Sequence, residues 1–186
     1  MEKKVKLNIF DKNFKELFSS QLISIFGGLI AGTALAIYTD KLLLIPGMLI
    51  LIPGFLEMRG SISGSFASRL SSGLFLKIIN PNKVKTKLIK GNIIASFFLA
   101  ALVSLTLGII AFAFNYFTIH EITKKIIFLP LIAGIIANAI EIPLTLFATI
   151  YLFKKGHDPN NIMGPFITST GDITSILALL VAIIIL

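Results

Sequence analysis

The 186-residue chain contains no cysteine, no tryptophan and only two histidines. Without cysteine it can form neither a disulfide nor a zinc–thiolate site, and it has no thiol nucleophile. His120 and His157 both lie in connections between apolar runs, where we expect solvated loop residues. Sites for soft metals are therefore disfavoured, because these need sulfur or clustered imidazole ligands.

Charged residues are also scarce. They make up 14% of the chain, and hydrophobic residues make up 55%, whereas about a quarter of a soluble domain is charged. The mean hydropathy of +0.92 and the gathering of apolar residues into long runs indicate a membrane protein of one domain. The net charge of +8 comes mostly from lysines between these runs. That placement fits membrane topology and anionic lipid headgroups better than nucleic acid.

A membrane-spanning helix needs about 20 mostly apolar residues. Residues 17–38, 92–117, 126–153 and 162–186 meet this requirement. The stretch 42–78 is less clear, because Pro-Gly pairs at 46–47 and 53–54 interrupt its apolar first half and its second half is rich in serine and glycine.

The distribution of Lys and Arg predicts the topology. Most of the lysines lie in the N-terminal segment (Lys3, Lys4, Lys6, Lys12 and Lys15) and in the 77–90 connection (Lys77, Lys83, Lys85, Lys87 and Lys90). The positive-inside rule then places the N-terminus inside and the C-terminus outside, which requires an odd number of crossings.

We therefore predict an all-α polytopic protein with five transmembrane helices. A broken or re-entrant segment would precede a second span at about 57–77. The expected organisation is a cytosolic segment at 1–16 and a membrane domain at 17–186, located in the plasma membrane.

Polar residues fall within three of these spans at spacings of three and four, so each set shares one helix face. Two explanations stay open: the stripes line a wet seam between helices, or they are small packing surfaces. The sets are Glu57, Ser61, Gly64, Ser65, Ser68 and Ser72; Asn138, Glu141, Thr145 and Thr149; and Pro165, Thr168, Asp172 and Ser175.

Two charges at membrane depth raise specific hypotheses, because each costs about 2.5–3.5 kcal/mol at a helix centre. Asp172 has no basic residue within its own span, so we expect it to bind a cation. Arg59 lies two residues after Glu57 and points away from it. We expect Arg59 to form a buried ion pair with Glu141 or Asp172; the alternative is a charge that tunes the ion path.

Two motifs resemble the MgtE family of magnesium channels. "GPFITSTGDITSILALL", preceded by "KKGHDP", is similar to the end of that family's membrane domain. "RGSISGSFASRLSS", at residues 59–72, resembles a second-span motif of the family's eukaryotic solute-carrier branch, in which Gly-Asn is followed by Ala-Ser-Arg-Leu-Ser.

The resemblance implies a homodimer with a pore along its two-fold axis. It implies that Asp172 contacts a hydrated Mg²⁺ ion, with Ser61, Ser65 and the Thr168 carbonyl lining the site. Ser61 stands where the family has Asn, and another lining position falls on Gly164. The family's large cytosolic sensing domain is expected to be absent, because the first span begins near residue 17.

The residues fit such a cargo. Mg²⁺ takes six oxygen ligands and sheds water reluctantly, so carboxylates, hydroxyls and carbonyls that accept from its water shell are suitable. Glu57, Glu141 and Asn138 are further candidates for contact with the ion.

A potential of 100 mV supplies about 4.6 kcal/mol to a divalent ion, so uptake needs no ATP. Two facing Asp172 carboxylates would repel without an ion, and one would hold a proton; we therefore expect ion binding to weaken as pH falls.

Three other functions remain as alternatives. The first is a cation exchanger coupled to Na⁺ or H⁺, for which Glu141 and Arg59 are the best residues. The second is a scaffold or subunit that transports nothing and uses its polar groups to join helices. The third, an intramembrane enzyme, lacks a His or Cys at membrane depth, so we expect no enzyme.

Overall fold

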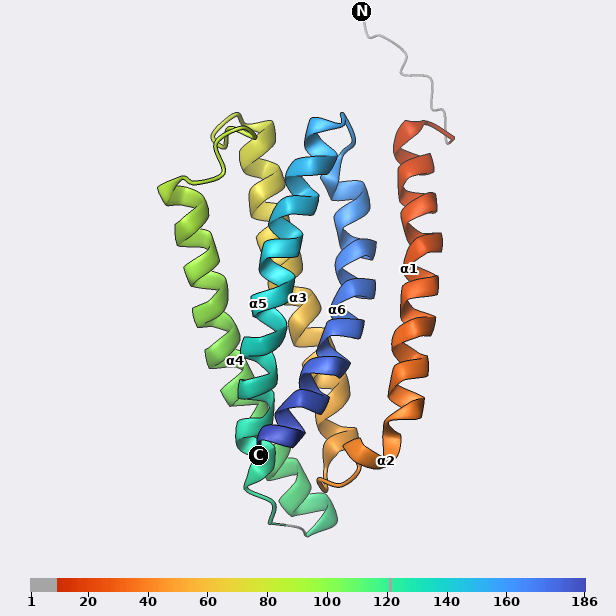
Figure 1. Cartoon of the computed structure of the whole chain (residues 1–186), viewed down its shortest axis with the longest axis vertical. Coiled ribbons are helices and arrows are strands. Elements are labelled where there is room, and N and C mark those ends of the chain that lie inside the picture. Colours follow the sequence, from red (N-terminus) through yellow and green to blue (C-terminus); the bar gives the residue numbers. More distant parts are fainter. Residues whose placement is uncertain (1–9, 121) are drawn as a thin grey trace, which may run out of the picture.

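The computed structural model describes residues 10–120 and 122–186, and its regular elements are all helices (Figure 1). Lys3, Lys4, Lys6 and Glu121 lie outside the described residues. The all-α prediction is confirmed. The helices are α1 (Lys12–Ile37), α2 (Thr39–Leu42), α3 (Met48–Phe75), α4 (Lys87–Ile119), α5 (Lys125–Lys154) and α6 (Pro159–Ile185).

Within the described residues, four helices are long and apolar enough to cross a membrane: α1, α4, α5 and α6. They contain nearly all of the four predicted runs and extend them by a few residues at most ends. The chain is therefore a multi-pass membrane protein. α3 has 28 residues but carries two arginines and several serines, and it is not among those four. Its crossing of the membrane stays a prediction.

The segment before α3 differs from the prediction. A broken or re-entrant piece ending near residue 56 is not observed, because α3 begins at Met48 and continues through Pro53. A proline removes one backbone hydrogen bond, and burial of Leu51, Ile52 and Phe55 offsets that loss. The chain reverses direction earlier, at Gly47, whose φ of +86° is a conformation that residues with a side chain rarely adopt.

The long helices run along the same axis in alternating directions (Figure 1). The start of α1 and the connections 76–86 and 155–158 lie at one end of the bundle. α2, the end of α4, the start of α5 and the C-terminus lie at the other end. The two ends of the described chain are thus on opposite ends of the bundle, as five crossings would require.

Packing inside the bundle follows from small residues and helix caps. α5 contacts α3, α4 and α6, whereas α1 packs mainly along α6 at the edge. At Gly108 a Cβ atom would collide with the backbone carbonyl of Ile127, so only glycine lets α4 approach α5 so closely. α6 begins at an Asp158-Pro159 cap, where the Asp158 side chain accepts a hydrogen bond from the Asn160 N–H at 2.9 Å.

A polar cluster ties α1 to the connection before α6. Glu16 Oε1 lies 2.9 Å from His157 Nδ1, and Glu16 Oε2 accepts a hydrogen bond from Asn161 Nδ2 at 3.1 Å. His157 lies in a connection and is exposed, as predicted from the sequence, and its ring also contacts Glu16. The cluster fixes the start of α1 against the start of α6.

Candidate functional site

The serine stripe of α3 points out of the bundle. Glu57, Ser61, Ser65, Ser68 and Ser72 are all exposed, although the helix that carries them buries apolar residues on its other side. The Ser61 hydroxyl lies 3.5 Å from a Glu57 carboxylate oxygen. A row of hydroxyls and a carboxylate thus covers one outward side of α3. This helix is about as long as its membrane-spanning neighbours.

A matching row lies on α6. Gly164 and Thr168 are exposed and Asp172, the middle residue of the helix, is half-buried. Pro165 and Ser175 are buried, so their assignment to the same stripe was wrong. Asn160 is exposed and extends the row by one turn, which a spacing of four from Gly164 could have revealed. We call these two rows the outer polar face; its residues are Glu57, Ser61, Ser65, Ser68 and Ser72 of α3 and Asn160, Gly164, Thr168 and the half-buried Asp172 of α6.

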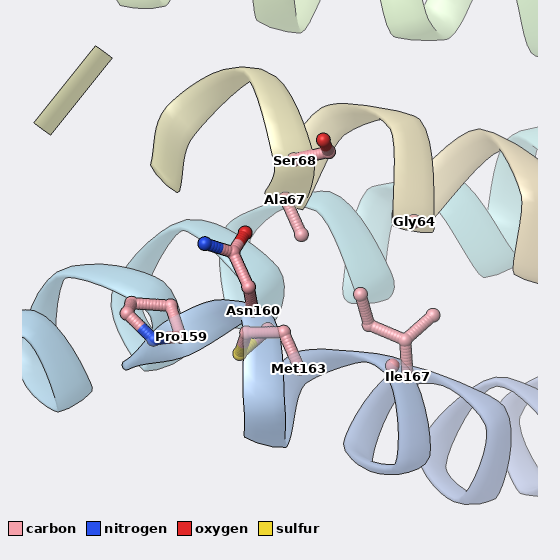
Figure 2. A pocket seen from close by; sticks show the side chains of 8 residues that line it. Gly64, Ala67, Ser68, Pro159, Asn160, Met163 and Ile167 are labelled. Carbon is pink, nitrogen blue, oxygen red and sulfur yellow. The ribbon is translucent and has the colours of Figure 1, made fainter. Parts of the chain in front are cut away.

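The two rows meet at a hollow of about 220 Å³ between α3 and α6 (Figure 2). Gly64 and Ser68 line it from α3, and Asn160 and Gly164 line it from α6. The rest of its lining is apolar: Ala67, Pro159, Met163 and Ile167. In Figure 2 the Asn160 side chain points toward α3. The hollow is large enough for several water molecules, so the outer polar face includes a recess that water can fill.

A second polar region lies inside the bundle. Arg59 and Glu141 are each 1% exposed, and an Arg59 guanidinium nitrogen lies 3.7 Å from Glu141 Oε2. Arg59 also donates a hydrogen bond to the Asn138 side chain. The predicted ion pair is confirmed, with Glu141 as the partner. A buried pair of this kind avoids the large cost of an isolated charge.

Glu141 connects this cluster to α6. Its two carboxylate oxygens accept hydrogen bonds from Thr170 Oγ1 at 3.0 Å and Thr174 Oγ1 at 2.8 Å. These threonines stand two positions before and two positions after Asp172. Side chains two positions apart on a helix point in very different directions, so Glu141 holds the face of α6 that lies away from Asp172. Sequence analysis missed both threonines, although their spacing of four marks a shared face.

The predicted site residues therefore divide into two groups. Glu57, Ser61, Ser65, Thr168 and Asp172 belong to the outer polar face, whereas Asn138 and Glu141 lie in the buried cluster. Of the two explanations for the stripes, a single wet seam between all three helices is not seen, because the α5 stripe is buried while those of α3 and α6 face outward. Within residues 10–120 and 122–186, no three His, Cys, Asp or Glu side chains gather closely enough to hold a bare metal ion. A hydrated ion, whose ligands are waters, needs no such cluster.

These features define an α-helical multi-pass membrane protein with a polar outer face and a separate buried ion pair. A family profile described as "MgtE: Divalent cation transporter" matches residues 52–182, well over half of the chain. The chain belongs to this family of divalent cation transporters. The match confirms both the resemblance seen in the two motifs and the expectation of a transporter instead of an enzyme. Searches among curated proteins and among solved structures returned no significant match.

Proposed function

We propose that the protein moves a hydrated divalent cation, foremost Mg²⁺, through a polar path formed where two copies bring their outer polar faces together. Asp172 supplies the charge that attracts the ion. Ser61, Ser65 and the backbone carbonyl of Thr168 accept hydrogen bonds from its water shell. The membrane potential drives the movement, and the plasma membrane is the proposed location.

The observation that carries this proposal is the outward direction of the outer polar face. A carboxylate at a helix centre costs about 2.5–3.5 kcal/mol against lipid, and Asp172 is the middle residue of an apolar helix. Polar stripes that only joined helices within one copy would be buried, as Asn138, Glu141 and Thr145 are. A second copy of the same face would remove the stripe from lipid and enclose water beside it.

The ligand set favours magnesium over softer ions. Among the described residues, the outer polar face offers carboxylate and hydroxyl oxygens and no imidazole, and the only sulfur at its hollow is the thioether of the buried Met163. Mg²⁺ keeps several waters when it binds, so acceptors spread along a face suit it. One Asp172 from each copy would balance the two charges of the ion.

Coupled exchange with Na⁺ or H⁺ needs a carboxylate that can release its ligand in every cycle. Glu141 was the best sequence candidate, but Arg59, Thr170 and Thr174 already engage it. Binding and release at Glu141 would have to break these contacts each time. This geometry favours a channel or uniporter over an exchanger.

Ion flux in proteoliposomes tests transport itself. Purified protein is reconstituted into liposomes that contain a magnesium-sensitive dye. External Mg²⁺ is then added with and without an inside-negative potential. We expect uptake that rises with the potential and needs no Na⁺ or pH gradient. Absence of uptake for Mg²⁺, Mn²⁺, Co²⁺, Ni²⁺ and Ca²⁺ alike would support a non-transporting scaffold. Uptake that requires an opposing Na⁺ or H⁺ gradient would support exchange.

The lack of native cysteine allows a direct test of the outer polar face. Ser65→Cys places one thiol on that face, and Ala95→Cys places one on an exposed position of α4 at a similar distance from the same end of the bundle. In membranes we expect a water-soluble methanethiosulfonate to modify Ser65→Cys and to reduce its flux, while Ala95→Cys stays unmodified in lipid. Equal protection of both thiols would contradict a watery path on this face.

A further inference from the structure

A second hollow, of about 480 Å³, lies where α4 begins beside the end of α5. Lys85, Lys87 and Lys90 line it together with Ile89, Ile93 and Leu146. The lysines are exposed, so their ammonium groups can reach water and headgroups. Ile89 is buried and Ile93 is half-buried. The hollow thus combines a basic rim with an apolar wall.

The turn that carries the lysines has a fixed shape. Ile79 is only 3% exposed and occupies the space beside Gly73. The Lys83 N–H donates to the Asn80 carbonyl at 3.0 Å, and the Thr86 N–H donates to the Val84 carbonyl at 3.0 Å. The Thr86 side chain then caps α4. The backbone that carries the lysines is therefore held by contacts within the chain.

The three lysines lack a negative partner in the described part of the chain. None of them forms an ion pair there, and no acidic side chain lines the hollow. The N-terminus of α4 adds its own partial positive charge at the same place. A ligand with a negative head would relieve this concentration of positive charge.

We propose that this hollow binds one anionic phospholipid of the inner leaflet. Its phosphate and headgroup lie among Lys85, Lys87 and Lys90, and an acyl chain follows Ile89, Ile93 and Leu146. A small soluble anion would leave the apolar wall uncovered, and a neutral lipid would leave the lysines uncompensated. The positive-inside rule places these lysines at the cytosolic surface, where anionic lipids are concentrated.

Lipid binding to the purified, delipidated full chain tests the proposal. Native mass spectrometry and thermal shift compare phosphatidylglycerol with phosphatidylcholine of the same acyl chains. Each Lys residue near an anionic surface strengthens the attraction to it. We therefore expect wild type to prefer phosphatidylglycerol by at least about tenfold, since 1.4 kcal/mol is a factor of ten.

Three variants make the test specific. The triple variant Lys85→Gln, Lys87→Gln, Lys90→Gln is expected to lose the preference. A control triple with equal loss of charge at the other end of the bundle, Lys41→Gln, Lys124→Gln, Lys125→Gln, is expected to keep it. Ile93→Trp places a larger side chain in the hollow at its apolar wall. It should weaken phosphatidylglycerol binding without changing any charge.

Three results would overturn the proposal. The first is equal binding of the two lipids by wild type. The second is an equal loss of preference in both triples. The third is competition by inorganic phosphate at the lipid's own concentration, which would mean that the site recognises a free anion and makes no use of the apolar wall.

Discussion

The buried pair of Arg59 and Glu141 should be strongly coupled in stability. Each side chain is 1% exposed, so removal of one leaves the other as an unpaired charge inside the bundle. Loss of one partner of a buried pair costs about 3–5 kcal/mol. We expect Glu141→Gln to be the worse single change, because the Arg59 guanidinium cannot lose its proton. In Arg59→Met the Glu141 carboxylate can take up a proton and become neutral.

The double variant distinguishes coupling from general damage. Arg59→Met combined with Glu141→Gln removes both charges, and the glutamine still accepts a hydrogen bond from Thr170 or Thr174. We expect the double variant to regain about 2 kcal/mol relative to Glu141→Gln alone, within the range of measured coupling energies. Flux through the folded Glu141→Gln protein should also fall, because Thr170 and Thr174 then hold the Asp172-bearing helix less firmly.

Equilibrium unfolding in mixed micelles, followed by circular dichroism, measures these differences. Glu57→Gln serves as the control, since it removes an exposed charge from the helix that carries Arg59; a change within about 0.5 kcal/mol is expected. Additive costs, with the double variant less stable than either single, would refute the coupling and with it the account of the buried cluster.

Two further predictions concern packing and pH. Gly108→Leu should push α4 away from α5, because the added side chain meets the Ile127 carbonyl. We expect this variant to lose its folded peak in size-exclusion chromatography. The control Gly91→Leu, at an open position on the same helix, should elute as wild type. Mg²⁺ flux should fall as pH is lowered, because protonation of Asp172 removes the charge that attracts the ion. Dye-based uptake measured through the acid range checks this, and a flat profile would count against an Asp172 ion site.

Hydropathy predicted the long helices well, because a helix that crosses the membrane needs about 20 mostly apolar residues. The predicted runs 126–153 and 162–186 differ from α5 and α6 by no more than three residues at any end. The error at α3 has a simple cause. A Pro-Gly pair signals a break in isolation, but tertiary packing of Leu51 and Phe55 keeps the helix continuous across Pro53.

The candidate site was only partly predictable. Helical spacing shows that Glu57, Ser61 and Ser65 share a face, but it cannot tell whether that face points inward or outward. The spacing also could not choose between Glu141 and Asp172 as the partner of Arg59. That choice depends on the rotation of α5 and α6 against α3, which long-range packing decides.

The most direct test of the central claim is Mg²⁺ uptake by Asp172→Asn in proteoliposomes, beside Asp40→Asn, which removes an equal charge from the exposed turn of α2. Both variants should fold as wild type by circular dichroism. We predict that Asp172→Asn loses about tenfold or more of the uptake, as expected when an interaction worth 1.4 kcal/mol or more is lost, while Asp40→Asn keeps it. Wild-type uptake by folded Asp172→Asn would contradict the claim that this carboxylate attracts the transported ion.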